Sequence, residues 1–177
     1  MNRSELVEAL SEVGQELERR GVMARLYIVG GALMVLAHNF RDSTMDVDGD
    51  FYPRDLVIEV AREVAERRDL PADWLNAAAS GFIPAFKSPD WRPLFQFGSL
   101  DILAADNRTM LAMKIRASRG RRDEPDIAFL LQACGITTVT EAFALYEEYF
   151  PEDPAPSRAR DVVEFLLAGT NEAVRPH

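Results

Sequence analysis

The stretch Leu26-Tyr27-Ile28-Val29-Gly30-Gly31, followed by Ala32-Leu33-Met34-Val35-Leu36-Ala37-His38, decides the fold of this chain. Its first half is apolar, rich in β-branched and aromatic residues, and ends at a glycine pair, which is typical of a buried strand. Its second half contains no helix breaker and predicts a short buried helix over 32–38. The sheet therefore starts with a strand that turns through two glycines into a helix.

The segments around this unit show two periodicities. Apolar residues at helical spacing predict helices over 4–20, with Ser4 as its cap, and over 54–68. Alternating acids and apolar residues predict a strand over 45–52. Residues 94–97 and 100–103 are predicted to form two strands, or one strand bent at Gly98-Ser99. The proline-rich stretch 71–93, between them and the second helix, predicts an irregular excursion.

Beyond residue 108 the chain is predicted to be entirely helical. The expected helices cover residues 109–118, 124–134, 139–149 and 158–168. We therefore predict an α+β fold in which a small mixed β-sheet with flanking helices is followed by a helical C-terminal part. The division is an α/β core over 1–108 and a helical part over 109–177, which we expect to pack on the core as one compact unit.

Composition restricts the function classes. The 177 residues include 29 acidic and 20 basic ones, for a formal net charge of −9, which argues against a broad DNA-binding surface. The single cysteine, Cys134, excludes an intramolecular disulfide and a zinc site built from cysteines. No apolar run approaches the roughly 18 residues of a membrane span, so we expect a cytoplasmic protein without a membrane partner.

The acids of the 45–52 strand are the sharpest chemical signal. Asp46 and Asp48 lie two residues apart and so point to one side of a strand, with Cα atoms about 6.5–7 Å apart. Such a pair can hold a hard cation, Mg²⁺ or Mn²⁺. Asp101, a lone acid between Leu100 and Ile102, is the candidate third carboxylate for a two-ion site. The alternative is that these acids form an ordinary solvated strand face.

The glycine pair adds a second signal. Backbone N–H groups at a strand–Gly-Gly–helix junction are free to bind phosphate, although a glycine pair alone also fits a simple turn. Here the Gly-Gly unit precedes an Asp-x-Asp strand. Val29-Gly30-Gly31-Ala32-Leu33 and Arg41-Asp42-Ser43-Thr44-Met45-Asp46-Val47-Asp48 together resemble the signature of the nucleotidyltransferase superfamily, the DNA polymerase β-like fold.

This resemblance implies a set of roles. The glycine pair would hold the phosphates of a nucleoside triphosphate, and Asp46, Asp48 and Asp101 would be the catalytic, metal-binding carboxylates. Asp101 would be either the third metal ligand or the base that activates the acceptor hydroxyl. A second stretch, Lys114-Ile115-Arg116 with Arg121-Arg122-Asp123-Glu124-Pro125-Asp126, resembles small bacterial members that include abortive-infection toxins of toxin–antitoxin systems. The nucleotide-binding residues implied by the resemblance are Gly30, Gly31, Arg41, Thr44, Lys114, Arg122 and Asp126.

The implied reaction moves a nucleoside monophosphate from the triphosphate to an acceptor hydroxyl. The acceptor would be RNA, such as a tRNA end, a protein or a small molecule, and a cognate antitoxin is an expected partner. Gly49 and Asp50 depart from the family pattern, which has apolar residues after the second acid. Glycine weakens a central strand, so this strand is expected to bulge or end early. Because the third carboxylate lies outside the quoted motif, the main alternative is a non-catalytic relative that binds a nucleotide or a partner protein.

The same acids also fit parts of two other motifs. A calcium loop starting at Asp46 would need glycine at its sixth position and glutamate at its twelfth, where this chain has Phe51 and Val57. The Asp-x-Asp-Gly string also resembles haloacid-dehalogenase-type phosphatases, in which the first Asp is a nucleophile. That motif should follow a continuous apolar strand, whereas polar residues precede Asp46, so the phosphatase is the weaker alternative.

Overall fold

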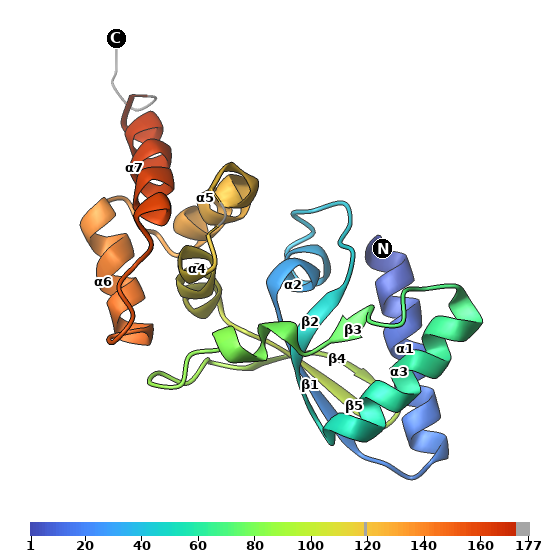
Figure 1. Ribbon diagram of the computed structural model, residues 1–177. Helices are drawn as coiled ribbons and strands as arrows, with labels where there is room; N and C mark the ends of the chain where they lie inside the picture. Colours follow the sequence, from blue (N-terminus) through green and yellow to red (C-terminus); the bar gives the residue numbers. More distant parts are fainter. Residues whose placement is uncertain (119, 173–177) are drawn as a thin grey trace. The chain divides into compact units, whose positions relative to one another are not determined.

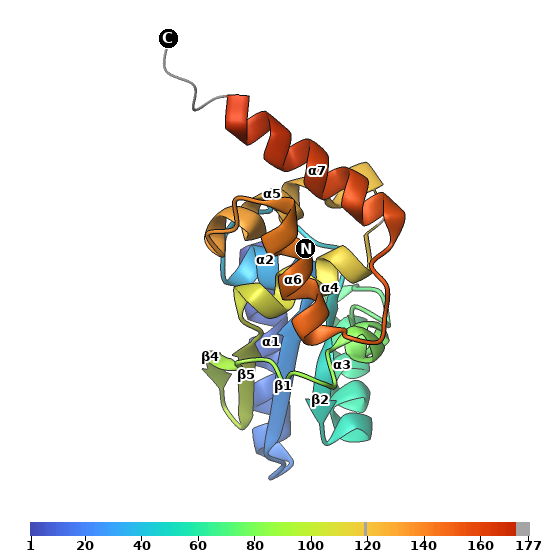
Figure 2. The same cartoon turned by 90° about the vertical axis from the view of Figure 1, so that its left-hand side faces the viewer.

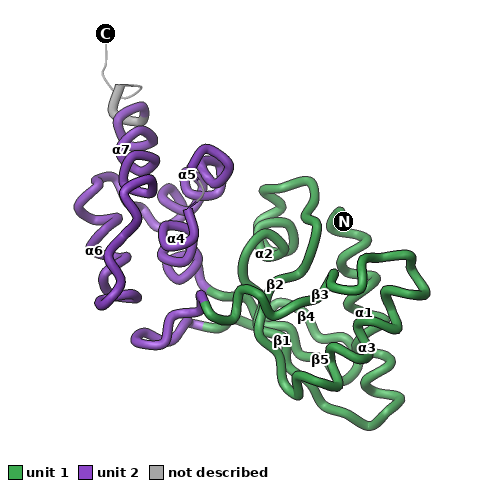
Figure 3. The backbone as a smooth tube through the Cα atoms, viewed as in Figure 1, with its two compact units in different colours: residues 1–81, 91–105 green, residues 82–90, 106–177 purple. Residues whose placement is uncertain are grey.

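The computed structural model describes residues 1–118 and 120–172, with residues 170–172 described by their backbone alone (Figure 1). The chain divides into two compact units (Figure 3). Unit 1 contains residues 1–81 and 91–105, and unit 2 contains residues 82–90 and 106–177. The sequence-based division had assigned 82–90 and 106–108 to the core, and these residues belong to unit 2.

A five-stranded mixed sheet forms the centre of unit 1, with the strand order β3-β2-β1-β5-β4. The strands are β1 (Ala24–Val29), β2 (Val47–Tyr52), β3 (Leu75–Asn76), β4 (Arg92–Phe97) and β5 (Leu100–Ala104). The central strand β1 pairs antiparallel with β2 and parallel with β5. Together with the helices, this sheet confirms the predicted α+β class and the mixed sheet.

Three α-helices accompany the sheet in unit 1: α1 (Arg3–Arg19), α2 (Gly30–Leu36) and α3 (Arg54–Arg68). α1 packs on α3, β4 and β5, and α3 packs on β2, so both helices cover the same face of the sheet (Figures 1 and 2). The cap of α1 is Asn2 rather than Ser4. Asn2 and Glu5 form a reciprocal capping box, which satisfies two backbone N–H groups of the first turn.

The two faces of the sheet differ in polarity because side chains alternate along each strand. Leu26 and Ile28 of β1 are fully buried, as are Leu100 and Ile102 of β5. The residues between them point to the opposite face, where β2 presents its acids at alternate positions. The apolar face holds the core, and the polar face carries the groups available for chemistry.

The excursion 71–93 contains more regular structure than the sequence predicts. Trp74 is fully buried, and its indole N–H donates to the carbonyl of Ala61 in α3 over 2.9 Å. This anchor places β3 beside β2 in parallel, with Asn76 level with Asp48. A short 3-10 helix, η1 (Ala78–Phe82), follows.

Unit 2 is helical. Its elements are α4 (Asn107–Arg116), the 3-10 helix η2 (Gly120–Asp123), α5 (Glu124–Ala133), α6 (Val139–Tyr149) and α7 (Ser157–Glu172). α4 packs on α5 and α6, and α7 packs on both of these. Buried apolar side chains such as Leu111, Ile127 and Val163 fill the space between the helices. In the part of the chain that is described, no helix is both long and apolar enough to cross a membrane.

Candidate functional site

The glycine pair lies against the first residues of β2. Gly30 has a φ of +72°, a conformation that strains any residue with a Cβ, and a Cβ there would lie 3.5 Å from Asp48 Oδ2. A Cβ on Gly31 would lie 2.9 Å from Thr44 Oγ1 and 4.0 Å from a guanidinium nitrogen of Arg41. Gly30 therefore lies next to the Asp48 carboxylate, and Gly31 lies next to Thr44 and Arg41.

The register of the strands explains this proximity. Val29, the last residue of β1, pairs with Asp48, so the turn into α2 begins level with the start of β2. Asp46 directly precedes β2, and its backbone carbonyl accepts a hydrogen bond from the Thr44 hydroxyl over 3.2 Å. The structure thus brings together six of the residues that the resemblance implied. We call Gly30, Gly31, Arg41, Thr44, Asp46 and Asp48 the glycine–aspartate site.

Asn76 belongs to the same site, and the sequence did not predict it. Its side-chain amide donates to Asp46 Oδ2 over 3.5 Å, and its backbone is the register neighbour of Asp48 on β3. Asn76 lies in the excursion 71–93, to which the sequence assigned no role. The apolar pair Trp74-Leu75 directly before it is the one local sign of a strand there.

Asp101 lies elsewhere, which corrects its assignment as a third metal ligand. It pairs with Arg25 on β1, whereas Asp48 pairs with Val29. This offset of four residues along β1 separates Asp101 from Asp48 by about 13 Å along the strands, and β1 lies between them. Asp101 cannot share a metal ion with Asp48 across that distance.

The remaining carboxylates fit one magnesium ion better than two. No group of three His, Cys, Asp or Glu side chains arranged to hold a metal occurs among the described residues. Asp46 and Asp48 alone supply two carboxylates, and Mg²⁺ is commonly held by one or two carboxylates together with the phosphates of a substrate. The donor set therefore matches a magnesium–nucleotide complex rather than a metal ion bound by protein ligands alone.

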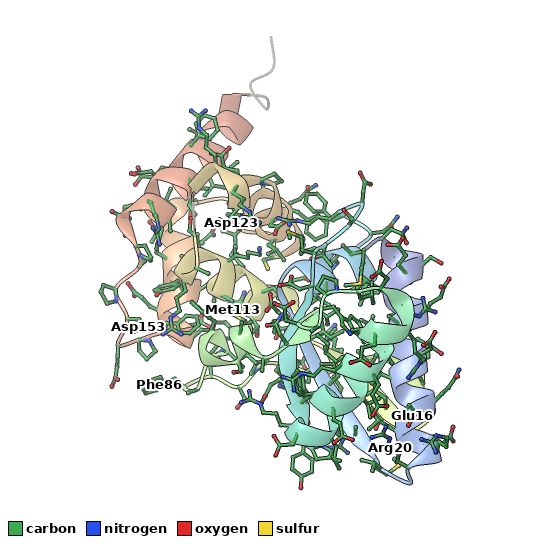
Figure 4. All side chains as sticks on the ribbon, turned by 45° about the vertical axis from the view of Figure 1, so that its right-hand side comes forward. Glu16, Arg20, Phe86, Met113, Asp123 and Asp153 are labelled. Carbon is green, nitrogen blue, oxygen red and sulfur yellow. The ribbon has the colours of Figure 1, made fainter. Side chains whose placement is uncertain are left out.

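Lys114 and Asp126, which the resemblance placed at the nucleotide, form a buried ion pair within unit 2. Lys114 Nζ lies 2.7 Å from Asp126 Oδ2 and 3.5 Å from Asp123 Oδ1. The side chains are 13%, 0% and 4% exposed respectively, so two carboxylates share one ammonium group away from water. Figure 4 labels Asp123 in this unit. The pair holds α4 against the start of α5, and its role at a nucleotide stays a prediction.

The basic stretch that contains Lys114 is only partly available to a ligand. Arg116 pairs with Asp153 over 2.6 Å, and its guanidinium lies 4.6 Å from the ring centre of Phe150. Arg119 lies outside the described residues. Arg122 is exposed in η2, so its side chain is accessible, and its contact with a nucleotide also stays a prediction.

The geometry of Asp46 bears on the phosphatase alternative. Asp46 precedes β2, and β2 runs antiparallel to its neighbour β1. A nucleophilic Asp of the phosphatase motif should instead follow an apolar strand, so this arrangement does not favour a phosphatase.

Comparisons of the chain with models of protein families, with curated proteins and with solved structures gave no match.

Proposed function

We propose that this chain is a magnesium-dependent nucleotidyltransferase of the DNA polymerase β-like fold. The observation that carries the proposal is the direct approach of Gly30 to the carboxylate of Asp48. A glycine pair beside two carboxylates offers backbone to phosphate and oxygen ligands to the accompanying metal. The mixed sheet with β1 between β2 and β5 supports the same assignment.

Each residue of the glycine–aspartate site has a role in this proposal. The glycines let the triphosphate approach the backbone, where the first N–H groups of α2 have no partner within the helix. The Arg41 guanidinium offsets phosphate charge, and Thr44 supports the turn through its bond to Asp46. Asp46 and Asp48 would hold Mg²⁺, which supplies positive charge at the phosphates, and Asn76 would fix the Asp46 carboxylate.

The reaction is the transfer of a nucleoside monophosphate. The oxygen of an acceptor hydroxyl forms a bond to the α-phosphorus, the bond from that phosphorus to its bridging oxygen breaks, and pyrophosphate leaves. The hydroxyl proton passes to solvent. Positioning and charge stabilisation supply most of the catalysis in such a step.

The resemblance over residues 25–130 supports the finer parts of the proposal. Lys114, Arg122 and Asp126 occupy the positions that bind the nucleotide in the toxin-like members. By the same resemblance, the acceptor is RNA, such as a tRNA end, a protein or a small molecule. By the same resemblance, a cognate antitoxin would be a binding partner, and the protein would act in the cytoplasm.

A non-catalytic nucleotide-binding relative is the second candidate. The position of Asp101 favours it, because the strand register leaves Asp46 and Asp48 without that third carboxylate. A site with two carboxylates can bind a magnesium–nucleotide complex without activating the acceptor. This candidate predicts nucleotide binding without turnover.

Transfer from α-labelled nucleoside triphosphates with magnesium tests the two candidates. The wild type is compared with Asp46→Ala/Asp48→Ala and with Asp50→Ala, a control on the same strand outside the glycine–aspartate site. We expect labelling of an acceptor by the wild type and by the control only. Nucleotide binding without labelling would select the second candidate, and equal labelling by all three proteins would refute the catalytic assignment.

A further inference from the structure

A pocket of about 340 Å³ lies at the end of the sheet opposite to the glycine–aspartate site. It is lined by Met23, Ala24, Arg25, Tyr27, Tyr52 and Asp101. All of these residues belong to unit 1. The volume falls at the small end of the range of about 300–1,000 Å³ that is usual for small-molecule sites. We call it the Arg25–Asp101 pocket.

The two charged residues of the pocket are neighbours that do not pair. Arg25 and Asp101 are register partners on the parallel strands β1 and β5, so their Cα atoms are about 4.8 Å apart. The structure, in its described residues, shows no ion pair or hydrogen bond for either side chain. Asp101 is only partly exposed, and a charged group that loses water without gaining a partner costs free energy. Both groups therefore have hydrogen-bonding capacity left for a ligand.

Other charges in unit 1 behave differently. Arg20, for example, bonds to Glu16, Glu59 and Glu63 at distances of 2.5–2.7 Å. Arg68 likewise bonds to Glu8 and Glu12. Arg20 and Arg68 thus pair with carboxylates within reach, whereas Arg25 and Asp101, which are neighbours on adjacent strands, form no such pair within the described part of the chain.

Aromatic side chains form the sides of the pocket. Tyr52 is the register partner of Arg25 on β2 and is 75% exposed. The Tyr27 ring is held by an edge contact with Trp91, at 5.0 Å between ring centres and an angle of 63°. Met23, 68% exposed, adds a polarisable surface. A flat aromatic ligand can stack against such walls, as bases stack on aromatic side chains in nucleic-acid complexes.

The polar groups restrict which ring fits. A ligand must offer hydrogen-bond donors to the Asp101 carboxylate and acceptors to the Arg25 guanidinium. Guanine has two neighbouring donors, N1–H and the N2 amino group, which match the two oxygens of one carboxylate. Its O6 and N7 are the acceptors that arginine binds most often in nucleic acids. Adenine lacks the paired donors, and a phosphate would be repelled by Asp101.

We propose that the Arg25–Asp101 pocket binds a guanine base. The carboxylate of Asp101 accepts from N1–H and N2–H, the guanidinium of Arg25 donates to O6 and N7, and Tyr27 and Tyr52 contact the ring. The pocket lies on the same sheet as the glycine–aspartate site, about 13 Å away along the strands. If the proposed transferase function holds, the guanine belongs to the acceptor, but guanine binding itself does not depend on that function.

Nucleosides test the pocket separately from the proposed function, because they carry no phosphate and need no metal. Guanosine, inosine and adenosine are titrated into the full chain in EDTA, with binding followed by calorimetry and by the fluorescence of Trp91 and Trp74. Inosine lacks only the N2 amino group. We expect guanosine to bind about tenfold more tightly than inosine, and adenosine to bind more weakly still. Equal affinity for guanosine and adenosine would overturn the proposal.

Substitutions in the Arg25–Asp101 pocket test whether guanosine binds there. Asp101→Asn keeps the side-chain size but replaces one acceptor by a donor, and it should weaken guanosine binding at least tenfold. Arg25→Gln should weaken it as well and serves as the second variant if Asp101→Asn unfolds. Asp48→Asn, at the other site, should leave it unchanged. Loss of guanosine binding in Asp48→Asn, with retention in the two pocket variants, would contradict the assignment.

The source of the guanine is decided by a further titration. An oligouridine RNA with one central guanosine is compared with free guanosine and with the same RNA carrying adenosine instead. Tighter binding of the guanosine-containing RNA than of free guanosine identifies a base within a strand. Equal binding of both identifies a mononucleotide, and equal binding of the two RNAs would argue against a guanine pocket.

Discussion

Gly30 and the carboxylate of Asp48 face each other so closely that a Cβ on Gly30 would lie 3.5 Å from Asp48 Oδ2. The pairing of Val29 with Asp48 imposes this relationship, because the chain leaves β1 one residue later. Backbone that can bind phosphate and a carboxylate that can bind magnesium are thereby fixed by the sheet itself. Elements with regular hydrogen bonding hold such a site more rigidly than loops do.

Replacing Gly30 tests the contribution of the glycine. Gly30→Ala should cost about 1–2 kcal/mol of stability, since the residue has a φ of +72°, and should also abolish stabilisation by magnesium and a nucleoside triphosphate. Gly21→Ala is the matched control, because Gly21 has a φ of +69° and no atom within 4 Å of a Cβ. Melting curves with and without nucleotide distinguish the two. Retained stabilisation in Gly30→Ala would show that the glycine is needed for the turn alone.

Removing the cation of the Lys114–Asp126 ion pair should strongly lower the free energy of unfolding. Lys114→Met leaves Asp123 and Asp126 buried without their shared cation and should cost about 3–5 kcal/mol in urea unfolding. Lys87→Met removes an ion pair to Glu148 in which both side chains are nearly half exposed, and should cost about 0–1 kcal/mol. A loss in Lys114→Met as small as that in Lys87→Met would contradict a stabilising role of this buried ion pair.

Glu16 predicts a pH dependence of stability. Hydrogen bonds from Arg19 and Arg20 lower the pKa of Glu16 from 4.5 to about 2, and Figure 4 shows Glu16 beside Arg20. A carboxylate with a lowered pKa stabilises the folded state above its unfolded pKa and loses that effect as the pH falls. The melting temperature of Glu16→Gln should therefore lie below that of the wild type at pH 6 and converge with it between pH 4.5 and 2.

The control for this pH series is Glu66→Gln, an exposed position on α3. Its melting temperature should follow that of the wild type at every pH. A difference between Glu16→Gln and the wild type that stays constant down to pH 2 would contradict the lowered pKa of Glu16.

Local periodicity was enough to predict most elements of the fold. The helix over 54–68 has the predicted boundaries, and the strand before Gly30 ends at Val29 as predicted but begins two residues earlier, at Ala24. The sequence does not predict strand β3 because two residues give no periodicity, and the strand directly follows the buried Trp74, whose indole bonds to Ala61 of α3. The cap of α1 was misplaced because Asn2 and Ser4 are both capping residues, and the capping box with Glu5 favours Asn2.

Within the candidate site, too, the positions set by local sequence could be predicted, and the positions set by long-range strand pairing could not. Gly30 and Asp48 could be placed together because the sequence has a strand–Gly-Gly–helix unit followed by an Asp-x-Asp strand. The position of Asp101 depends on the register between β1 and β5, which are far apart in the sequence, and a shift of a few residues moves a side chain from one end of the sheet to the other. Composition and spacing do not determine that register.

Calorimetric titration of a non-hydrolysable nucleoside triphosphate with magnesium tests the central claim most directly. The titration compares the wild type with Asp48→Asn and with Asp50→Asn, two residues further along the same face of β2. We predict that the wild type and Asp50→Asn bind the magnesium–nucleotide complex with equal affinity and that Asp48→Asn binds it at least tenfold more weakly. Equal binding by Asp48→Asn and the wild type would contradict a nucleotide site at Gly30 and Asp48.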